Sequence, residues 1–191
     1  MHTDQAEATN LELWSLYDIR ATAYLNVLYY GRRASTWSGW NLAFQVVASL
    51  TSLGAVSGFL ALGTNPKWKW ISASIGVASA VCAIMPAILG HAEKINKFEK
   101  LHFAYCELFE LSKRTLLEVR RMGTITNEQL GAVKLLNDLC SRLGRIDDPD
   151  QKDGLRTKCE QKVRLRFPAD ELWYAGENAG TETNAPAAAE A

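Results

Sequence analysis

WNLAFQVVASLTSLGAVSGFLAL, residues 40–62, and WISASIGVASAVCAIMPAIL, residues 70–89, decide the fold of this 191-residue chain. Neither stretch contains Asp, Glu, Lys, Arg or His. As α-helices they would be about 34 and 30 Å long, which matches the roughly 30 Å hydrocarbon core of a bilayer. The segment between them, GTNPKWK at 63–69, contains the Gly, Asn and Pro that are typical of a turn, and is expected to be an extracytoplasmic loop. The two stretches therefore predict a transmembrane helical hairpin.

Tryptophans at the ends of both stretches favour a membrane over a soluble core. Trp37 and Trp40 flank the start of the first stretch, and Trp68 and Trp70 lie beside the start of the second. Indole rings collect at the headgroup depth of a bilayer, so all four are predicted to be interfacial anchors. The alternative, a buried hairpin in a soluble helical bundle, gives no reason for tryptophans at both ends.

The charges around the hairpin predict its orientation. The basic residues next to its outer ends are Arg32, Arg33, Lys94, Lys97 and Lys100. The loop carries only Lys67 and Lys69. Because Lys and Arg accumulate on the cytoplasmic side, we expect a multi-pass protein of the cell inner membrane with both termini in the cytoplasm. No cleavable signal peptide is expected, since the first apolar stretch begins too late for one.

The rest of the chain predicts an all-α membrane protein, with a two-helix transmembrane hairpin and long N- and C-terminal cytoplasmic helices. An amphipathic helix is expected over residues 10–39, with Gly31 and Gly39 as possible hinges. Its apolar stripe consists of Trp14, Tyr17, Ala21, Tyr24 and Leu28. Residues 90–177 are expected to form a cytoplasmic helical region. Flexible ends are expected at residues 1–9 and 178–191.

The region after the hairpin divides into predicted helices. Residues 91–122 carry a coiled-coil-like apolar spacing at Phe98, Leu101, Tyr105, Leu108, Thr115 and Val119. This helix is expected to pack antiparallel to the N-terminal helix or against neighbouring subunits, and to end at Gly123. Thr126 and Gln129 predict a capping box for a helix that runs to about Leu143. A charged helix over 151–166 presents Lys158, Lys162, Arg164 and Arg166, either as a solvated face or toward anionic lipid.

Polar and small residues within the hairpin form two predicted sets. Asn41, Gln45, Ser49 and Ser52 fall within about 80° on a helical wheel and are the candidate pore-lining residues. Two interpretations remain open: these side chains hydrogen-bond across helix interfaces, or they line a water-filled path in an oligomer, since two helices alone cannot enclose a pore. The candidate helix-packing residues are Gly54, Gly58, Ser72, Gly76 and Ser79.

Catalytic motifs are not found in the sequence, so we expect no enzyme, no catalytic residue, no cofactor and no metal ion. His102 and Cys106 lie one helical turn apart, which predicts a packed pair, because zinc sites normally need three or four ligands. Lys+Arg and Asp+Glu both total 21, which argues against a nucleic-acid partner. The four cysteines are expected to be free thiols.

The segment LWSLYDIRATAYLNVLYYGRRAS, residues 13–35, leads into the Trp-flanked hairpin and then a long cytoplasmic helix. This layout, over about residues 10–165, resembles the SLATT family, bacterial two-transmembrane effector domains associated with SMODS nucleotidyltransferases and SLOG sensors. The resemblance implies a homo-oligomeric pore-forming effector that disrupts the bacterial inner membrane in an antiviral or conflict system, with a separate sensor or nucleotide-signalling protein as partner. It supplies no functional residues that can be carried over. The alternative is a non-conducting membrane anchor or scaffold that presents its cytoplasmic helices to a soluble partner; a membrane-associated enzyme is disfavoured.

Overall fold

The computed structural model describes residues 2–62, 66–147 and 151–168, and most of their side chains. In this part of the chain the regular structure is entirely α-helical, which confirms the predicted all-α class. The helices are α1 (His2–Leu62), α2 (Pro66–Ile88), α3 (His91–Met122), α4 (Asn127–Ile146) and α5 (Asp153–Arg166). The predicted C-terminal tail, residues 178–191, and residues 63–65 of the predicted loop lie outside the described residues. Residues 66–69, which were predicted to belong to that loop, form the start of α2.

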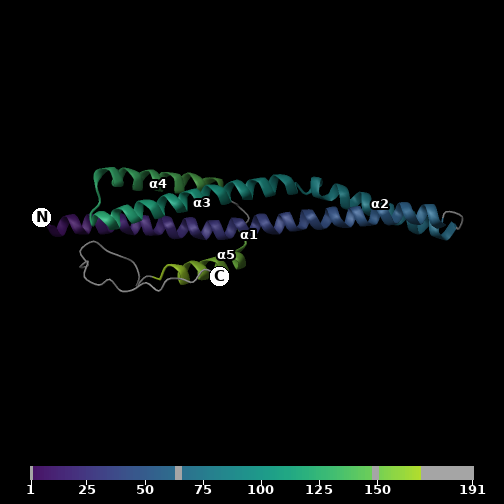
Figure 1. The fold of residues 1–191 in the computed structure, drawn as a ribbon, viewed down its shortest axis with the longest axis horizontal. Helices are drawn as coiled ribbons and strands as arrows, with labels where there is room; N and C mark the ends of the chain where they lie inside the picture. Colours follow the sequence, from purple (N-terminus) through teal and green to yellow (C-terminus); the bar gives the residue numbers. More distant parts are fainter. Residues whose placement is uncertain (1, 63–65, 148–150, 169–191) are drawn as a thin grey trace.

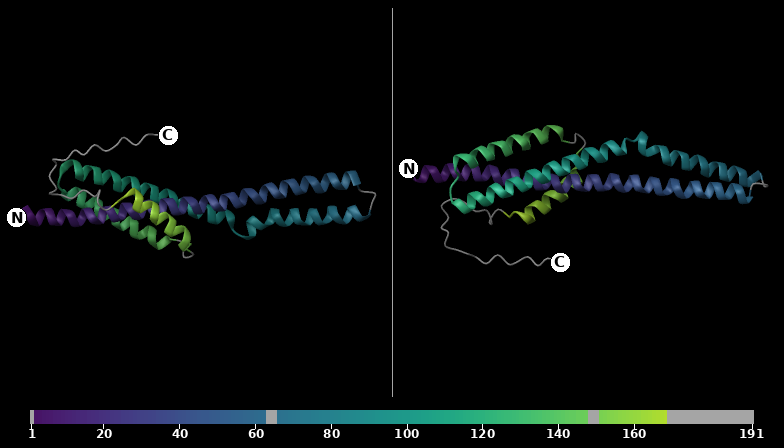
Figure 2. Two further views of the ribbon diagram at one scale, coloured as in Figure 1. Left: turned by 90° about the horizontal axis from the view of Figure 1, so that it is seen from below. Right: turned by 45° about the horizontal axis from the view of Figure 1, so that its top comes forward.

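The first helix, α1, runs unbroken for 61 residues and is about 90 Å long at 1.5 Å per residue. The predicted segments 10–39 and 40–62 are two parts of this one helix, and Gly31 and Gly39 lie inside it without a break. Figures 1 and 2 show α2 alongside the C-terminal half of α1 and α3 alongside its N-terminal half. The molecule therefore has a hairpin arm, made by α1 and α2, and a bundle end, made by α1, α3, α4 and α5.

A two-residue break at Leu89 and Gly90 separates α2 from α3. Gly90 has a φ of 63°, in the left-handed region that residues with a Cβ rarely adopt. Pro86 lies inside α2 one turn before Gly90 and cannot donate a helical hydrogen bond. The chain changes direction between α2 and α3 (Figure 2), so the break marks the boundary between the hairpin arm and the bundle end.

The bundle core lies between α1 and α3 and is rich in aromatic rings. The α3 residues that the coiled-coil spacing singled out are all buried: Phe98, Leu101, Tyr105, Leu108, Thr115 and Val119. Tyr30 of α1 stacks on Tyr105, with ring centroids 5.8 Å apart and planes at 7°, and also stacks on Phe98. Burial raises the pKa of Tyr105 to about 12, so its hydroxyl stays neutral in this core. The predicted antiparallel packing of the two long helices is confirmed.

The apolar stripe predicted for the N-terminal helix is confirmed only in part. Tyr17 is buried, but Trp14 is 56% exposed, and Ala21, Tyr24 and Leu28 are only half-buried. The buried residues of this part of α1 are Leu13, Leu16, Tyr17, Ile19, Ala23, Asn26, Tyr29, Tyr30 and Arg33. The reason is that α3, α4 and α5 all pack on α1, so residues on more than one side of the helix are covered.

The ends of the shorter helices follow capping rules. Gly123 ends α3 with a φ of 73°, as predicted. The capping box is confirmed: Gln129 donates its backbone N–H to the Thr126 hydroxyl at 3.4 Å, and Thr126 donates its own to the Gln129 side chain at 3.0 Å. The prediction that this helix ends near Leu143 is wrong, because α4 continues through Gly144 to Ile146. A glycine in a helix interior weakens the helix without requiring it to end.

α3 packs closely on α1 at Gly31. The His102 ring of α3 lies over this residue, and its Nδ1 donates a hydrogen bond to the carbonyl oxygen of Val27 at 3.0 Å. A Cβ placed on Gly31 would lie 3.2 Å from two atoms of that ring, closer than normal van der Waals contact. A Cβ on Gly39 would meet nothing within 4 Å. Gly31 is therefore required by packing, and Gly39 is not.

We predict that Gly31→Ala and Gly39→Ala have opposite effects on stability. Alanine is favoured over glycine in a helix interior by about 1 kcal/mol, so Gly39→Ala should raise the unfolding midpoint. At Gly31 the same methyl group displaces His102 from Val27, so this variant should melt below the wild type. Thermal unfolding of the detergent-solubilised protein, followed by circular dichroism, measures both. Equal stabilisation by the two substitutions would contradict the close packing at Gly31.

Candidate functional site

The hairpin arm exposes large apolar side chains along its described length. Those of α1 are Trp40, Leu42, Val46, Val47, Leu50 and Leu53; those of α2 and the break are Trp70, Ile71, Ile75, Val77, Val81, Ile84, Ile88 and Leu89. Within the described residues, one helical stretch, Ala73–Met122, contains a segment long and apolar enough to cross a membrane, with a mean hydropathy of 2.0. Only 6% of that segment is buried, whereas the core helix of a soluble protein is mostly buried. The uncharged part of the stretch belongs to α2.

The predicted anchors and part of the predicted packing set can be located on this arm. Trp70 is 78% exposed and Trp40 is also exposed. Trp37 is half-buried, because the ammonium of Lys94 lies 4.4 Å above its ring. Gly54 and Gly58 lie on α1 and Trp68 and Ser72 on α2, but their side-chain surroundings are outside the described residues.

A shallow groove of about 470 Å³ runs between α1 and α2 on the hairpin arm. Its lining consists of small residues: Ala48, Ser49, Ser52, Gly76, Ser79, Ala80 and Ala83. The Ser79 hydroxyl donates a hydrogen bond to the carbonyl oxygen of Ala48 at 2.8 Å, which joins the two helices, and Ser79 is only 6% exposed. The groove thus brings together two sets of residues that were predicted separately: Ser49 and Ser52 of the pore-lining set, and Gly76 and Ser79 of the helix-packing set.

The candidate pore-lining residues of α1 are called the polar stripe from here on: Asn41, Gln45, Ser49 and Ser52. They are of two kinds, serines and amides. Ser49 and Ser52 donate their hydroxyls to backbone carbonyl oxygens one turn earlier in α1, at 2.8 and 2.9 Å. Asn41 is half-buried and Gln45 is exposed, and no hydrogen bond connects either side-chain amide to another described residue. The serines are therefore satisfied within their own helix, while the two amides are left for water, a ligand or a second chain.

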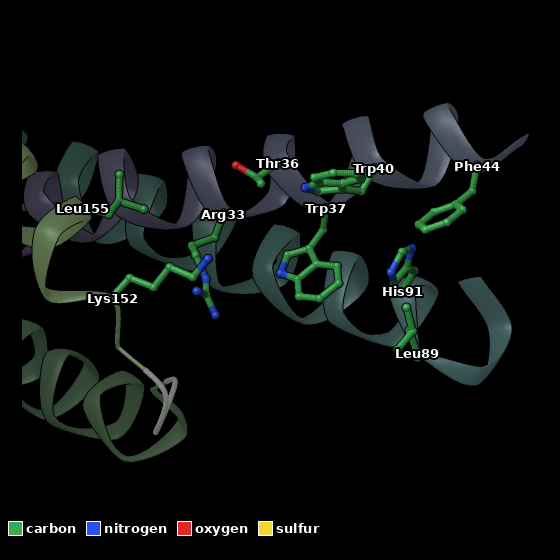
Figure 3. Close-up of a pocket in the computed structure, with 9 residues that line it drawn as sticks. All are labelled: Arg33, Thr36, Trp37, Trp40, Phe44, Leu89, His91, Lys152 and Leu155. Carbon is green, nitrogen blue, oxygen red and sulfur yellow. The ribbon is translucent and has the colours of Figure 1, made fainter. Parts of the chain in front are cut away.

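A second site, which we name the junction pocket, lies where the hairpin arm meets the bundle end (Figure 3). It has a volume of about 340 Å³ and is lined by Arg33, Thr36, Trp37, Trp40, Phe44, Leu89, His91, Lys152 and Leu155. Arg33, Lys152 and Leu155 lie toward one end of the row of side chains, and Phe44, His91 and Leu89 lie at the other, with Trp37 between the two groups. The backbone N–H of Lys152 donates to the Tyr29 hydroxyl at 3.0 Å, which ties the start of α5 to α1 beside the pocket.

Two buried polar side chains form walls of the junction pocket. The Arg33 side chain is 7% exposed, and its guanidinium carbon lies 4.8 Å from the centre of the Phe98 ring. His91 is 2% exposed, and its ring meets Trp37 edge to face at 4.9 Å. The Nδ1 atom of His91 is buried without a hydrogen-bond partner among the described residues.

His102 and Cys106 form the packed pair that their spacing predicted. Cys106 Sγ lies 3.8 Å from His102 Nε2, while the other ring nitrogen contacts α1. Burial raises the pKa of the Cys106, Cys140 and Cys159 thiols, which keeps them protonated and poorly nucleophilic. All four cysteines are free, as predicted.

The sequence analysis missed the junction pocket, because its lining comes from three separate segments around residues 33–44, 89–91 and 152–155. One local signal was available: Arg33 lies one helical turn before Trp37, and His91 follows the second apolar stretch after a single glycine. Comparison with known proteins adds no assignment, since no family model, curated protein or solved structure matches the chain. Chemically, the groove of small residues suits a second helix, and the junction pocket combines two cationic side chains with aromatic and aliphatic ones.

We predict that Ser79→Ala weakens the pairing of α1 and α2, whereas Ser74→Ala does not. Ser79 bonds across to α1, while the Ser74 hydroxyl bonds only to the Trp70 carbonyl of its own helix. Losing the cross-helix bond should cost about 0.5–1.5 kcal/mol. Unfolding of the protein in mixed micelles by increasing dodecyl sulfate measures the difference. Identical midpoints for both variants would show that this bond does not stabilise the hairpin.

Proposed function

We propose that the chain is a membrane effector of the bacterial inner membrane that oligomerises through its α1–α2 hairpin and forms a pore. The observation that carries this proposal is the uncovered apolar surface of the hairpin arm, on helices that hold no charged residue over residues 40–62 and 70–89. In water such a surface would be very costly, whereas in hydrocarbon it is the surface that a spanning helix needs.

The membrane placement accounts for the asymmetry of the molecule. The arm is uncharged along both apolar stretches, and the bundle end is rich in Lys, Arg, Asp and Glu. Lys94 and Trp37, a basic and an aromatic residue in contact, lie at the boundary between the two, where an interface would be. In this placement both apolar stretches span the bilayer, and the bundle and both termini lie in the cytoplasm.

Assembly through the hairpin follows from the groove. Small residues let helix backbones approach closely, and such contacts drive association between helices in lipid, where a hydrophobic force between them is lacking. Ser49, Gly76 and Ala83 leave an open strip along one side of the hairpin. A helix of a second copy can fill this strip, so the groove supports a homo-oligomer.

Conduction is supported by the two amides of the polar stripe. An amide transferred into hydrocarbon without a hydrogen bond costs roughly 4–8 kcal/mol, so Asn41 and Gln45 are unfavourable against lipid. Gln45 lies one turn before Ser49, which lines the groove, and Asn41 lies one turn before Gln45. The two amides are therefore near the surface at which copies would meet. In an oligomer these amides can face a shared water-filled path, which satisfies them without a partner from the same chain.

The biological setting is proposed from the resemblance to SLATT domains. Such a pore would disrupt the inner membrane when an antiviral or conflict system is activated, on a signal from a separate sensor or nucleotide-signalling protein. A non-conducting anchor or scaffold is the competing function. It predicts that the arm serves only for attachment, so that an unrelated hairpin would replace it without loss of function.

We predict that Asn41→Leu combined with Gln45→Leu abolishes leakage of ions or dye from liposomes and leaves the oligomer intact. The reason is that apolar side chains remove the polar lining while preserving the hairpin. Ser74→Leu is the matched control, because it removes a polar group from the exposed surface of α2 outside the groove. Leakage and oligomeric state are measured on the same reconstituted sample. Dissociation of the oligomer would assign the two amides to packing, and undiminished leakage would place the path elsewhere.

We predict that Gly76→Leu dissociates the oligomer, whereas Ala78→Leu does not. Gly76 lines the groove, while Ala78 is exposed on the same helix and outside the groove. A leucine side chain at Gly76 would occupy the space proposed for the second copy. Sedimentation equilibrium in density-matched detergent reports the mass of each variant. An unchanged mass for Gly76→Leu would remove the groove from the interface.

A further inference from the structure

We propose that a second pocket of the bundle end binds a soluble phosphate monoester through Arg20. This pocket, which we name the arginine pocket, has a volume of about 150 Å³ and is lined by Trp14, Tyr17, Asp18, Arg20, Ala21 and Phe167. Its lining comes from the N-terminal half of α1 and from the residue that follows α5. It shares no residue with the groove or the junction pocket, and the proposal does not depend on pore formation.

Arginines from three helices meet at this pocket. The positive charges of Arg120, in the last turn of α3, and of Arg166, at the end of α5, both act on Arg20 of α1. Burial, followed by the charge of Arg120, lowers the pKa of Arg20, although an arginine stays protonated in a protein. Arg120 also donates a hydrogen bond to the Tyr17 hydroxyl of the pocket wall at 3.3 Å. The fold therefore holds like charges together, an arrangement that an anion among them stabilises.

The hydrogen-bond donors of Arg20 are not used by the described part of the chain. Its guanidinium carbon lies 4.6 Å from the centre of the Phe167 ring and 5.8 Å from that of Phe109, so aromatic rings pack on the guanidinium. No hydrogen bond or ion pair joins its N–H groups to another described residue. Its Nε is buried and its two Nη groups are not, so the Nη groups are the donors that a ligand can reach. Such a fork of donors matches the oxygens of a phosphate.

The charge of this cluster suits a phosphate monoester better than a carboxylate. Besides Arg20 itself, two positive groups and one negative group, Glu110, act on the guanidinium, so the cluster has a net charge of about two. Glu110 is exposed, and the ammonium of Lys113 lies 3.8 Å from its carboxylate, so its charge is partly offset. A phosphate monoester carries about 1.5 to 2 negative charges at pH 7, whereas a carboxylate carries a single one. The monoester therefore neutralises the cluster almost completely.

Asp18 is the acidic residue in the pocket lining, and it is exposed. After burial, its charge is the second cause that raises the pKa of the Cys140 thiol of α4, whereas it is not among the groups that act on Arg20. Its carboxylate therefore lies nearer to α4 than to the guanidinium. As a negative charge at the same pocket it still repels an anion, so its removal should strengthen binding.

Size and position favour a soluble source of the phosphate. The pocket is smaller than the roughly 300 Å³ at which whole small-molecule sites begin, so it holds a phosphate group while the rest of the ester lies outside. Arg20 lies about 30 Å before Trp40 along α1, at 1.5 Å per residue. In the membrane placement proposed above, this distance separates the pocket from the lipid headgroups. The soluble source rests on that placement, whereas the phosphate site itself does not.

The test is a calorimetric titration of glycerol phosphate into the full-length protein in a neutral detergent at neutral pH. Arg20→Gln should weaken binding by about tenfold or more, since it removes a charged hydrogen bond to phosphate. Arg166→Gln should weaken binding about threefold, the effect of one exposed charge near the ligand. Arg164→Gln is the matched control, because it removes the same charge from an exposed position of α5 that does not line the pocket. Asp18→Asn should bind more tightly than the wild type.

Two results with the variants would overturn the site: equal losses in Arg164→Gln and Arg166→Gln, or weaker binding by Asp18→Asn. The first would show general attraction to positive charge, and the second would show that no anion binds beside Asp18. Arg20→Gln also loses the contact with Phe167, so its fold is checked by circular dichroism. If this variant unfolds, the substitutions at the exposed positions 18, 164 and 166 still decide the question.

Two further ligands test the chemistry and the source. Acetate that binds as tightly as glycerol phosphate would overturn the assignment to a phosphate. Phosphatidic acid, a lipid that carries the same monoester, would overturn the soluble source if it binds more tightly than glycerol phosphate. Flotation with phosphatidylcholine vesicles separates these failures from that of the membrane placement. If the wild type floats but does not bind glycerol phosphate, only the arginine pocket is wrong; if it binds but does not float, the membrane placement is wrong and the phosphate site stands.

Discussion

The continuity of α1 is the constraint on which the rest of the structure depends. One helix supplies half of the hairpin arm and the centre of the bundle end, so both parts share an axis over about 90 Å. Four glycines lie within α1, at 31, 39, 54 and 58, and each would weaken an isolated helix. At Gly31 the His102 ring of α3 lies over the helix and bonds to Val27 within the preceding turn, so packing contributes to stability where the local sequence does not.

Structural features that depend only on neighbouring residues in the sequence, such as helix caps, were predicted well. The capping box at Thr126 and the end of α3 at Gly123 depend only on residues within one turn. The buried residues of α3 were predicted because this helix has one main neighbour, so its apolar residues recur on one side. For α1 the same reasoning failed: Trp14 is exposed and Tyr29 is buried, because covering by α3, α4 and α5 spreads the buried residues around the helix.

The candidate sites show a second limit of the same kind. The polar stripe of α1 and the candidate helix-packing residues of α2 were each predicted from a periodic pattern along a single helix. Whether the two sets line one groove depends on how α1 and α2 are rotated about their own axes. A helical wheel of one helix does not contain this information, whereas the hydrogen bond from Ser79 to Ala48 does. The junction pocket was harder still, since Arg33, His91 and Lys152 come from segments that are brought to one pocket by the packing of both α3 and α5 on α1.

The two connections between the hairpin arm and the bundle end differ in stiffness. On one side α1 crosses the junction as an unbroken helix, and on the other the chain passes through Gly90, the residue between α2 and α3 that adopts a left-handed conformation. A displacement of α3 along α1 can therefore be absorbed at Gly90, but it must change the contacts that His91 makes with Trp37 and Phe44. These contacts form a wall of the junction pocket. The packing of His91 against Trp37 and Phe44 is consequently the contact through which a displacement in the bundle end would reach the hairpin arm.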